Sequence, residues 1–325
     1  MREYDNYVSY LNEKLNLPSS YHTEIIDLFA GCGGLSLGFE AQGFKTIGYE
    51  MNINSCETYR KNMLSTCYNI KLGVGKQKYP KVPVVIGGPP CQPFSERGLK
   101  KGAKDERNGF PVFIDAIRQI KPELWIFENV RGLATPKNKE YLETILSELK
   151  SLGYQIDYDV KAIKRYDVPQ NRFRFVAVGH KGGFQFPTER EYVVTAGEAV
   201  GDLVNSMPEN PQFLTPSMDQ YIAAYEKASH CARPRDLHMN EPARTLTCRN
   251  LAGATSDMHR VKLIDGRRRR ITVREAARLQ SFPDWFEFYG NEESQFTQIG
   301  NAVPPMFAYH LAGKVKEYLE SRGIL

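Results

Sequence analysis

Cysteine is scarce in this chain, and no two cysteines are spaced to act as a pair. None of the six belongs to a Cys-x-x-Cys motif, and a disulfide framework is not expected at this length. The nearest approach to a zinc-binding set, His230, Cys231, His238 and Cys248, follows no common zinc-site spacing. We therefore expect neither structural disulfides nor a bound metal. The six are Cys32, Cys56, Cys67, Cys91, Cys231 and Cys248.

Long apolar runs are also absent. No stretch approaches the length of a membrane-crossing helix, and the mean hydropathy is −0.47. Residues 1–20 lack the basic-then-apolar pattern of a signal peptide. The 325 residues, 41% hydrophobic and 25% charged, suffice for one large domain and a smaller one. We expect a cytoplasmic protein with no membrane contact.

Strand-like and helix-like segments alternate from residue 24 to about 180, which predicts an α/β fold with a parallel sheet. Beyond residue 185 this alternation stops, and residues 186–271 carry scattered prolines and arginines. Helical spacing returns after Thr272, a plausible N-cap. The sequence therefore predicts a large domain over residues 1–185, a smaller irregular domain over 186–271, and a return to the large domain over 272–325.

The stretch "DLFAGCGGLSLGFE" is a glycine-rich turn between a strand and a helix. Gly31, Gly33 and Gly34 permit close backbone approach, and the helix N-terminus offers free N–H groups. Ser36 stands where a third glycine of the dinucleotide fingerprint would be. Glu50 ends the next strand, 19 residues after Gly31, where an acid accepts hydrogen bonds from a ribose. These features favour a nucleoside cofactor, with NAD and S-adenosylmethionine both open.

Cys91 lies in "VPVVIGGPPCQPFSERG", directly after a predicted strand. Open α/β sheets bind ligands at the edge where such strands end, and Pro89 and Pro90 stiffen the approach. The glycine-containing, charged segment that follows indicates a loop. This setting favours a thiolate nucleophile, although an isolated cysteine is more often an inert buried one.

Glu128 ends the strand "ELWIFENV" and should reach the same edge, where a partly desolvated carboxyl can hold and donate a proton. The alternative is a helix-capping acid. Arg172 and Arg174, in "QNRFRF", should point to one side of a strand. Two guanidiniums aimed in one direction suit a nucleic acid or a clamp on Glu128, and the alternative is a surface ion pair.

Arginine is concentrated between residues 231 and 274, a stretch that contains ten arginines and only four acidic residues. Guanidinium groups bind phosphates and guanine edges well, so this region favours a nucleic-acid partner. A solvated, salt-bridged surface is the competing interpretation.

Together these motifs resemble those of the cytosine-5 DNA methyltransferases of bacterial restriction–modification systems. They occur in the family's order and frame nearly the whole chain. The resemblance implies a Rossmann-like, S-adenosylmethionine-dependent sheet, with residues 186–271 as a target recognition domain. The motifs that carry it are "DLFAGCGGLSLGFE", "GGPPCQPFS", "ENV" at 128–130, "QNRFR" at 170–174, "REAARLQSFPD" at 274–284 and "QIGNAVPP" at 298–305.

The resemblance implies a reaction in which the Cys91 thiolate adds to C6 of a cytosine flipped out of duplex DNA. Glu128 would act at N3, Arg172 would orient Glu128 or the base, and Arg174 would support base or phosphate contacts. It also implies a functional pairing with a restriction endonuclease, a monomeric protein, and a cytoplasmic, nucleoid-associated location.

The resemblance further implies two sets of binding residues. The chain departs from the family at Asn69, where an aspartate usually reads adenine, and at Met51, where an aromatic residue is common. The implied cofactor-binding residues are Phe29, Ala30, Gly31, Gly33, Gly34, Leu35, Glu50, Met51, Asn69, Ile70, Pro89, Asn301 and Ala302. The implied DNA-binding residues are Ser95, Arg97, Lys100, Lys101, Arg244, Thr247 and Arg249.

Three other functions remain open from the sequence. A tRNA cytosine-5 methyltransferase would share the catalytic motifs, but the Cys-Phe-Thr tripeptide typical of that branch is absent. A catalytically inactive DNA-binding regulator would not need every motif intact. A nicotinamide dehydrogenase would explain the glycine turn and Glu50 alone.

Overall fold

A seven-stranded sheet organises the protein, in the order β3-β2-β1-β4-β5-β8-β6. This is a computed structural model, and it describes residues 4–90, 108–231, 234–253 and 257–325. The strands of the sheet are β1 (Thr23–Leu28), β2 (Phe44–Glu50), β3 (Cys67–Asn69), β4 (Val84–Gly87), β5 (Leu124–Val130), β6 (Gln155–Ala162) and β8 (Phe173–His180).

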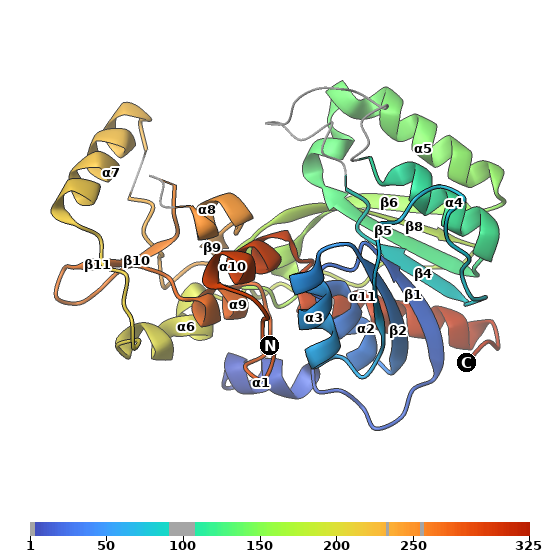
Figure 1. The fold of residues 1–325 in the computed structure, drawn as a ribbon, viewed down its shortest axis with the longest axis horizontal. Coiled ribbons are helices and arrows are strands. Elements are labelled where there is room, and N and C mark those ends of the chain that lie inside the picture. Colours follow the sequence, from blue (N-terminus) through green and yellow to red (C-terminus); the bar gives the residue numbers. More distant parts are fainter. Residues whose placement is uncertain (1–3, 91–107, 232–233, 254–256) are drawn as a thin grey trace.

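Helices cover both faces of the sheet, because alternate residues of each strand point to opposite sides (Figure 1). On one face, Ile25, Val84 and Val176 pack against α2 (Gly34–Ala41), α3 (Ile53–Asn62) and α11 (Pro305–Ser321). On the other face, Ile26 and Phe127 pack against α4 (Phe110–Ile120) and α5 (Lys139–Ser151). The C-terminal helix α11 thus completes a layer begun by the first fifty residues.

One strand departs from the expected parallel arrangement. Strands β1 to β5 run parallel to their neighbours, but β8 is antiparallel to both β5 and β6. The β6–β8 pair is close in sequence, and antiparallel pairing needs no helical crossover. The start of β8 therefore lies at the edge where β1, β2, β4 and β5 end. That reversal brings the "QNRFR" segment to the edge that carries Glu128.

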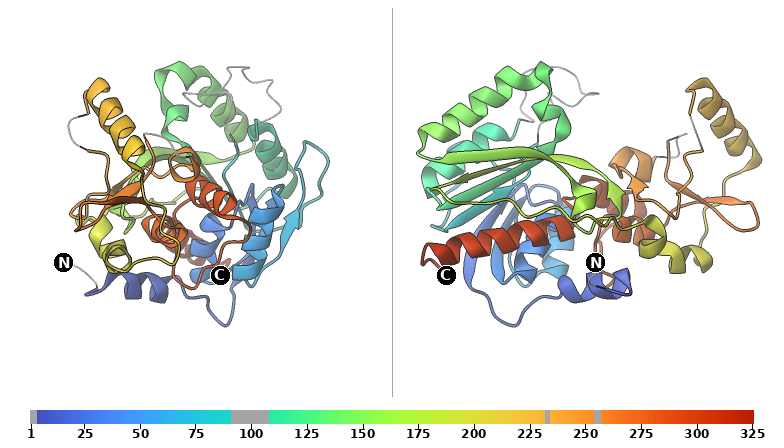
Figure 2. Two further views of the ribbon diagram at one scale, coloured as in Figure 1. Left: turned by 60° about the vertical axis from the view of Figure 1, so that its left-hand side comes forward. Right: turned by 180° about the vertical axis from the view of Figure 1, so that it is seen from behind.

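The segments between β8 and α9 (Val273–Leu279) extend to one side of the sheet (Figures 1 and 2). A parallel pair of short strands, β7 and β9, joins them to the sheet side, with Gln170 opposite Ala243 and Asn171 opposite Arg244. The elements between β8 and α9 are α6 (Ala196–Asn205), α7 (Pro216–Ala228), α8 (Cys248–Ala252), β9 (Ala243–Arg244), β10 (Arg260–Lys262) and β11 (Arg268–Arg270), and β7 (Gln170–Asn171) comes directly before β8.

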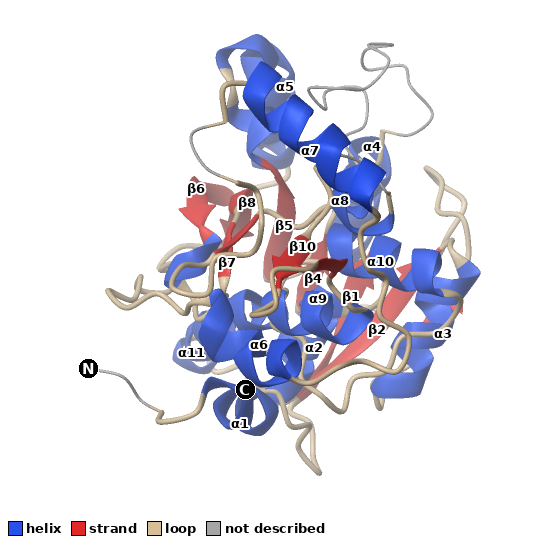
Figure 3. Ribbon diagram, turned by 90° about the vertical axis from the view of Figure 1, so that its left-hand side faces the viewer, coloured by secondary structure: helices blue, strands red, loops and turns tan. Residues whose placement is uncertain are grey.

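The remaining helices connect the two regions (Figure 3). Helix α1 (Tyr7–Lys14) packs near α6, and α10 (Glu292–Asn301) packs against α8 and α9. Short 3₁₀ helices span Arg131–Ala134, Pro136–Asn138 and Ile163–Arg165. None of the helices within the described ranges is both long and apolar enough to cross a membrane.

Helices α2 and α11 approach so closely that one glycine separates their backbones. A Cβ placed on Gly38 would lie 2.3 Å from the Tyr309 backbone nitrogen and 2.5 Å from the Ala308 carbonyl carbon. Such contacts involve backbone atoms, so no side chain can move aside to relieve them. The glycine therefore sets the distance at which α11 seats on the sheet.

We predict that Gly38→Ala lowers the free energy of unfolding by about 1–3 kcal/mol, because the added methyl overpacks this contact. The matched control is Gly201→Ala in α6, where a Cβ would meet nothing within 4 Å. There the helix propensity of alanine should be neutral or stabilising by up to about 1 kcal/mol. Urea denaturation of both variants measures the difference, and equal stabilities would contradict the close-approach argument.

Candidate active site

The sheet brings two glutamates and a proline-containing segment to one edge. Glu50 ends β2, the Gly88–Pro90 segment follows β4, and Glu128 lies near the end of β5. Because β4 pairs with both β1 and β5, the segment leading to Cys91 runs between the glycine turn and Glu128. A Cβ built on Gly88 would lie 3.9 Å from Glu128 Oε2. The edge therefore holds an acid directly beside the chain that leads to the cysteine.

Glu128 forms an ion pair with Arg174, whose Nε lies 2.7 Å from Glu128 Oε1. Both side chains are largely withdrawn from solvent, with 12–13% of each exposed. In the β5–β8 register Arg174 faces Val130, so it lies diagonally from Glu128 on the same face of the sheet. Burial lowers the pKa of Arg174, and the adjacent Glu128 carboxylate opposes that effect. The ion pair fixes the orientation of the Glu128 carboxyl at this edge of the sheet.

Asn129 holds the approach to the cysteine in place. Its Nδ2 donates to the Pro89 carbonyl at 2.8 Å, and its Oδ1 accepts from the Val130 N–H at 2.9 Å. The side chain is buried. Sequence reasoning did not assign Asn129 a site role, although its place in the "ENV" motif beside Glu128 was an available signal. The Gly109 N–H also donates to the Pro90 carbonyl, at 3.0 Å.

Residues 91–107 lie outside the described part of the chain. The predicted nucleophile Cys91 and the predicted DNA contacts Ser95, Arg97, Lys100 and Lys101 belong to that segment. The structure describes the chain up to Pro90 and again from Asn108, and Gly109 bonds to Pro90 across the gap.

Arg172 has a different role from the one expected from its spacing. It precedes β8, is fully buried, and donates through Nη1 to the Leu246 carbonyl at 2.7 Å. Its Nη2 donates to the carbonyls of Gly300 and Ala302, at 3.4 and 3.2 Å. Among the residues that the structure describes, Glu128 forms its ion pair with Arg174. Arg172 instead ties three distant chain segments together, and its burial lowers its pKa well below the ordinary value.

The glycine turn is joined to Glu50 by a hydrogen bond. The Gly31 N–H donates to Glu50 Oε2 at 2.9 Å, and the Asn52 N–H donates to Oε1 at 2.6 Å. Phe29 adopts a φ of 61° and Gly33, the N-cap of α2, a φ of 91°. These left-handed conformations fold the backbone sharply away from β1. The turn and the acid thus form one unit at the sheet edge.

The turn leaves space for a ligand. A Cβ on Gly31 would meet nothing within 4 Å, whereas one on Gly34 would meet the Val303 carbonyl oxygen at 2.3 Å. Gly34 is therefore a packing glycine, and Gly31 borders open space. Met51 and Ile70, at the ends of β2 and β3, expose 68% and 39% of their surface. Both side chains therefore offer apolar surface to a ligand.

The other predicted cofactor residues differ in burial and in their contacts. Ala30, Leu35 and Ala302 are buried, and Pro89 is the acceptor for Asn129. Asn301 is exposed at the end of α10. Asn69 is exposed, and its Nδ2 donates to the carbonyls of Glu50 and Met51, both at 3.1 Å.

The chain matches the family of C-5 cytosine-specific DNA methylases over residues 23–317. It belongs to that family. It is 51% identical over 321 residues to the Type II methyltransferase M.AplI of Arthrospira platensis, covering 98% of this chain and 93% of the relative. It is 32% identical over 345 residues to the Type II methyltransferase M.NgoFVII of Neisseria gonorrhoeae, covering 95% and 89%.

Solved structures of distant methyltransferases share the fold of this methylase. The Entamoeba histolytica methyltransferase EhMeth superimposes with a TM-score of 0.71 at 16% identity, covering 92% of this chain and 99% of that one. The Schizosaccharomyces pombe Dnmt2 methyltransferase gives 0.66 at 14% identity, with 92% and 99% covered. The sheet is thus the Rossmann-like sheet of methyltransferases, and the family membership identifies the activity as DNA cytosine-5 methylation.

Many arginines of the methylase between residues 231 and 274 are paired inside the protein. Arg260 and Arg269 are buried and bound to acids, the former to Glu226 and Asp236 and the latter to Glu275. Arg268 reaches Asp236 as well. Their positive charge is therefore largely used to hold the β10–β11 hairpin and its neighbours, and less of it faces solvent than the sequence suggested.

The three predicted DNA-binding residues in this region, Arg244, Thr247 and Arg249, differ in their hydrogen bonds within the protein. Arg244 donates to Asp257 at 2.9 Å, and Thr247 caps α8 by accepting from the Asn250 N–H. Thr247 and Arg249 are exposed on the first turn of that helix.

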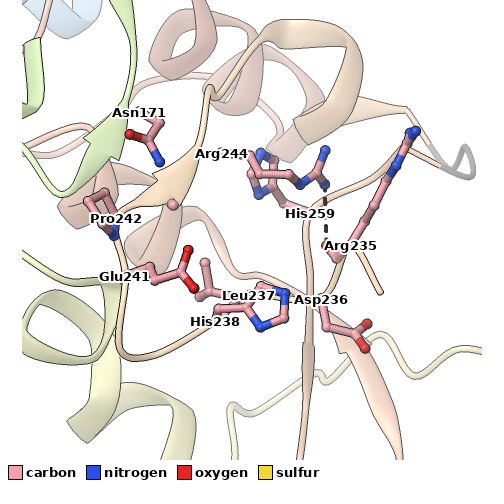
Figure 4. A pocket seen from close by; sticks show the side chains of 10 residues that line it. Asn171, Arg235, Asp236, Leu237, His238, Glu241, Pro242, Arg244 and His259 are labelled. Carbon is pink, nitrogen blue, oxygen red and sulfur yellow. Dashed lines mark hydrogen bonds between the residues drawn. The ribbon is translucent and has the colours of Figure 1, made fainter. Parts of the chain in front are cut away.

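A small polar cavity of about 50 Å³ lies under the β7–β9 pair of the methylase (Figure 4). Asn171, Glu241 and His259 line it together with Arg235 and Arg244. Burial lowers the pKa of His259 to about 3, and Arg244 adds to that effect, so the ring is neutral. The cavity lies at the junction between the sheet side and the arginine-rich region.

We predict that Asn129→Asp lowers the rate of methyl transfer roughly tenfold to a hundredfold, because a carboxylate would face the Pro89 carbonyl in place of a donor. Binding of the methyl donor should change less than the rate, since the hydrogen bonds of Asn129 to described residues go to Pro89 and Val130 and none reaches the glycine turn. Single-turnover methylation and calorimetry measure the two effects. The control Asp157→Asn alters an exposed acid on β6 and should retain the wild-type rate. A rate unchanged by Asn129→Asp would remove Asn129 from the site.

Proposed function

We propose that this methylase transfers a methyl group from S-adenosylmethionine to C5 of a cytosine that has been flipped out of duplex DNA. The observation that supports it most is the Glu128–Arg174 ion pair beside the Pro89–Pro90 segment, because an acid and the approach to a cysteine share one edge. A base inside a duplex cannot reach such an edge, so it must leave the helix.

Cys91 acts as the nucleophile. Attack of its thiolate at C6 interrupts the aromatic ring and makes C5 electron-rich. Pro90, held by Gly109, and Pro89, held by Asn129, limit how the preceding backbone can move. Loss of the C5 proton and departure of the thiolate then restore the ring after the methyl group has been added.

Glu128 acts at N3 of the cytosine, where a proton makes attack at C6 easier. Arg174 holds its carboxyl in place and adds a positive charge beside the base. Arg172 positions the site without contacting the base. Its guanidinium donates hydrogen bonds to the backbone carbonyls of Leu246, Gly300 and Ala302, and so holds them against the start of β8.

The turn between β1 and α2 binds S-adenosylmethionine, which supplies the methyl group as a sulfonium electrophile when bound. Glu50 accepts hydrogen bonds from the ribose hydroxyls, while the exposed side chains of Met51 and Ile70 contact the adenine. Asn69 offers its side-chain carbonyl to the adenine edge. The open space beside Gly31 and the exposed apolar pair fit such a ligand.

Residues 186–271 read the DNA sequence, and residues 1–185 with 272–325 carry catalysis. Ser95, Arg97, Lys100 and Lys101 contact the backbone near the flipped base. Thr247 and Arg249, which are exposed at the start of α8, and Arg244 also contact the DNA. The protein acts as a monomer in the cytoplasm, near the nucleoid. Two of its relatives, M.AplI and M.NgoFVII, are Type II methyltransferases, which supports a role paired with a restriction endonuclease.

The test is transfer of a labelled methyl group to duplex DNA and to tRNA. We predict incorporation into DNA alone, at C5 of cytosine, and none with Cys91→Ser. Glu128→Gln should retain donor binding but lose about 10²–10⁴-fold in rate, the usual contribution of a general acid. Transfer to tRNA instead of DNA, or full activity of Cys91→Ser, would contradict the proposal.

A further inference from the structure

A chain of five buried side chains runs beneath the glycine turn, from Asp27 on β1 to Glu40 on α2. Ser36 Oγ lies 2.7 Å from Asp27 Oδ2, and Tyr59 Oη lies 3.0 Å from Ser36 Oγ. Thr46 Oγ1 contacts Tyr59 Oη and lies 2.6 Å from Glu40 Oε1. All five residues are buried. The chain therefore links two carboxyls through three hydroxyls and away from water.

The hydroxyls of this chain donate towards both of its ends. Tyr59 donates to Ser36 and Ser36 donates to Asp27 Oδ2, whereas Thr46 donates to Glu40 Oε1. Each hydroxyl carries a single proton, so these three donations use all of them. Each carboxyl therefore accepts one hydrogen bond from the chain.

The surroundings of the two carboxyls favour a bound proton on Asp27 over one on Glu40. Glu40 also accepts from two backbone N–H groups, those of Leu64 at 3.3 Å and Thr46 at 3.4 Å, and such donors favour the ionised form. Asp27 Oδ1 is buried with no hydrogen-bond partner among the described residues. Burial raises the pKa of Glu40 as well, but the hydroxyls of Ser65 and Thr46 and the two backbone N–H groups oppose that effect, whereas Ser36 is the one hydrogen-bond donor that opposes it at Asp27 among the described residues.

The groups around Asp27 add negative charge or none. Ser36 contacts it from α2, Tyr59 of α3 is near enough for the Asp27 charge to raise the pKa of its hydroxyl, and Glu50 adds a negative charge from β2. On β3, Cys67 is near enough for the Asp27 charge to raise the pKa of its thiol, to which burial contributes most. Ile86 of β4 and Gly48 of β2, its partners in the sheet register, are uncharged. Burial raises the pKa of Asp27 to about 7, with Ser36 opposing and Glu50 adding to the shift.

Asp27 lies two residues before the turn that receives the methyl donor. We propose that Asp27 holds a proton in the free methylase and releases it to solvent when cationic S-adenosylmethionine binds at the turn. A cation favours the ionised carboxyl, and no described residue around Asp27 supplies that charge beforehand. This inference rests on the proposed use of S-adenosylmethionine. Asp27 is a positioning residue, because it acts through Ser36 and the turn.

Calorimetry in two buffers of different ionisation enthalpy counts the protons released on binding. We expect release of about half a proton per S-adenosylmethionine at pH 7, rising towards about one at pH 6 and vanishing at about pH 8.5. Donor binding without proton release at pH 6 and 7 would overturn the inference and leave the proposed function intact. Failure of the donor to bind at all would contradict the proposed function itself.

Asp27→Asn tests the assignment to this residue. Its amide can hydrogen-bond to Ser36 but cannot ionise, so donor binding should no longer release the proton. The control Asp265→Asn removes an exposed acid paired with Arg267 and should keep the release. If Asp27→Asn does not fold, Ser36→Ala interrupts the chain at its first link and should shift the pH at which release occurs. Unchanged release in Asp27→Asn, or in Ser36→Ala where that variant stands in, would overturn the inference.

The pH dependence of stability gives a readout without any ligand. The pKa of Asp27 is higher in the folded protein than its ordinary value near 4, so the folded state holds a proton that the unfolded state loses. The free energy of unfolding should therefore fall as pH rises towards about 7. In Asp27→Asn this fall should be smaller than in the wild type and in Asp265→Asn, measured by urea denaturation across that range. An equal fall in all three proteins would contradict the assignment.

Discussion

The ion pair between Glu128 and Arg174 depends on the reversal of a single strand. If β8 ran parallel to β5, its first residues would lie at the opposite edge of the sheet, a strand length away from Glu128. Because β8 is antiparallel, Arg174 enters at the edge where the parallel strands end. The carboxyl, the approach to Cys91 and the glycine turn then share one side of the molecule, and the rest of the fold keeps them there.

Residues far apart in the sequence maintain that edge. Arg172 binds backbone carbonyls at 246, 300 and 302, so it joins the arginine-rich region and the segment before α11 to the start of β8. Gly34 and Gly38 allow the 302–309 segment to lie directly on α2. The glycine turn and the start of β8 beside Glu128 therefore both pack against the same C-terminal segment.

The sequence predicted the local parts of this arrangement well. The alternating strands and helices, the glycine turn and the position of Glu50 all follow from short-range patterns, and Gly31 does bond to Glu50. The direction of β8 and the separate tasks of Arg172 and Arg174 did not follow, because a two-residue spacing says nothing about where the strand begins. The arginine-rich stretch was similarly ambiguous, since acids such as Glu226 and Asp219 that pair with it come from elsewhere in the chain. Contacts of that range are set by packing and cannot be read from local pattern.

The central claim is that the sulfur of Cys91 and the carboxyl of Glu128 act on one cytosine. The most direct measurement uses duplex DNA of mixed sequence that contains 5-fluorocytosine. Because fluorine cannot leave C5 as a proton does, the protein should remain joined to the base after methyl transfer. Peptide mapping of the adduct by mass spectrometry should then find the base on Cys91. An adduct on another residue, or methylation of ordinary DNA with no adduct on the fluorinated duplex, would contradict the account.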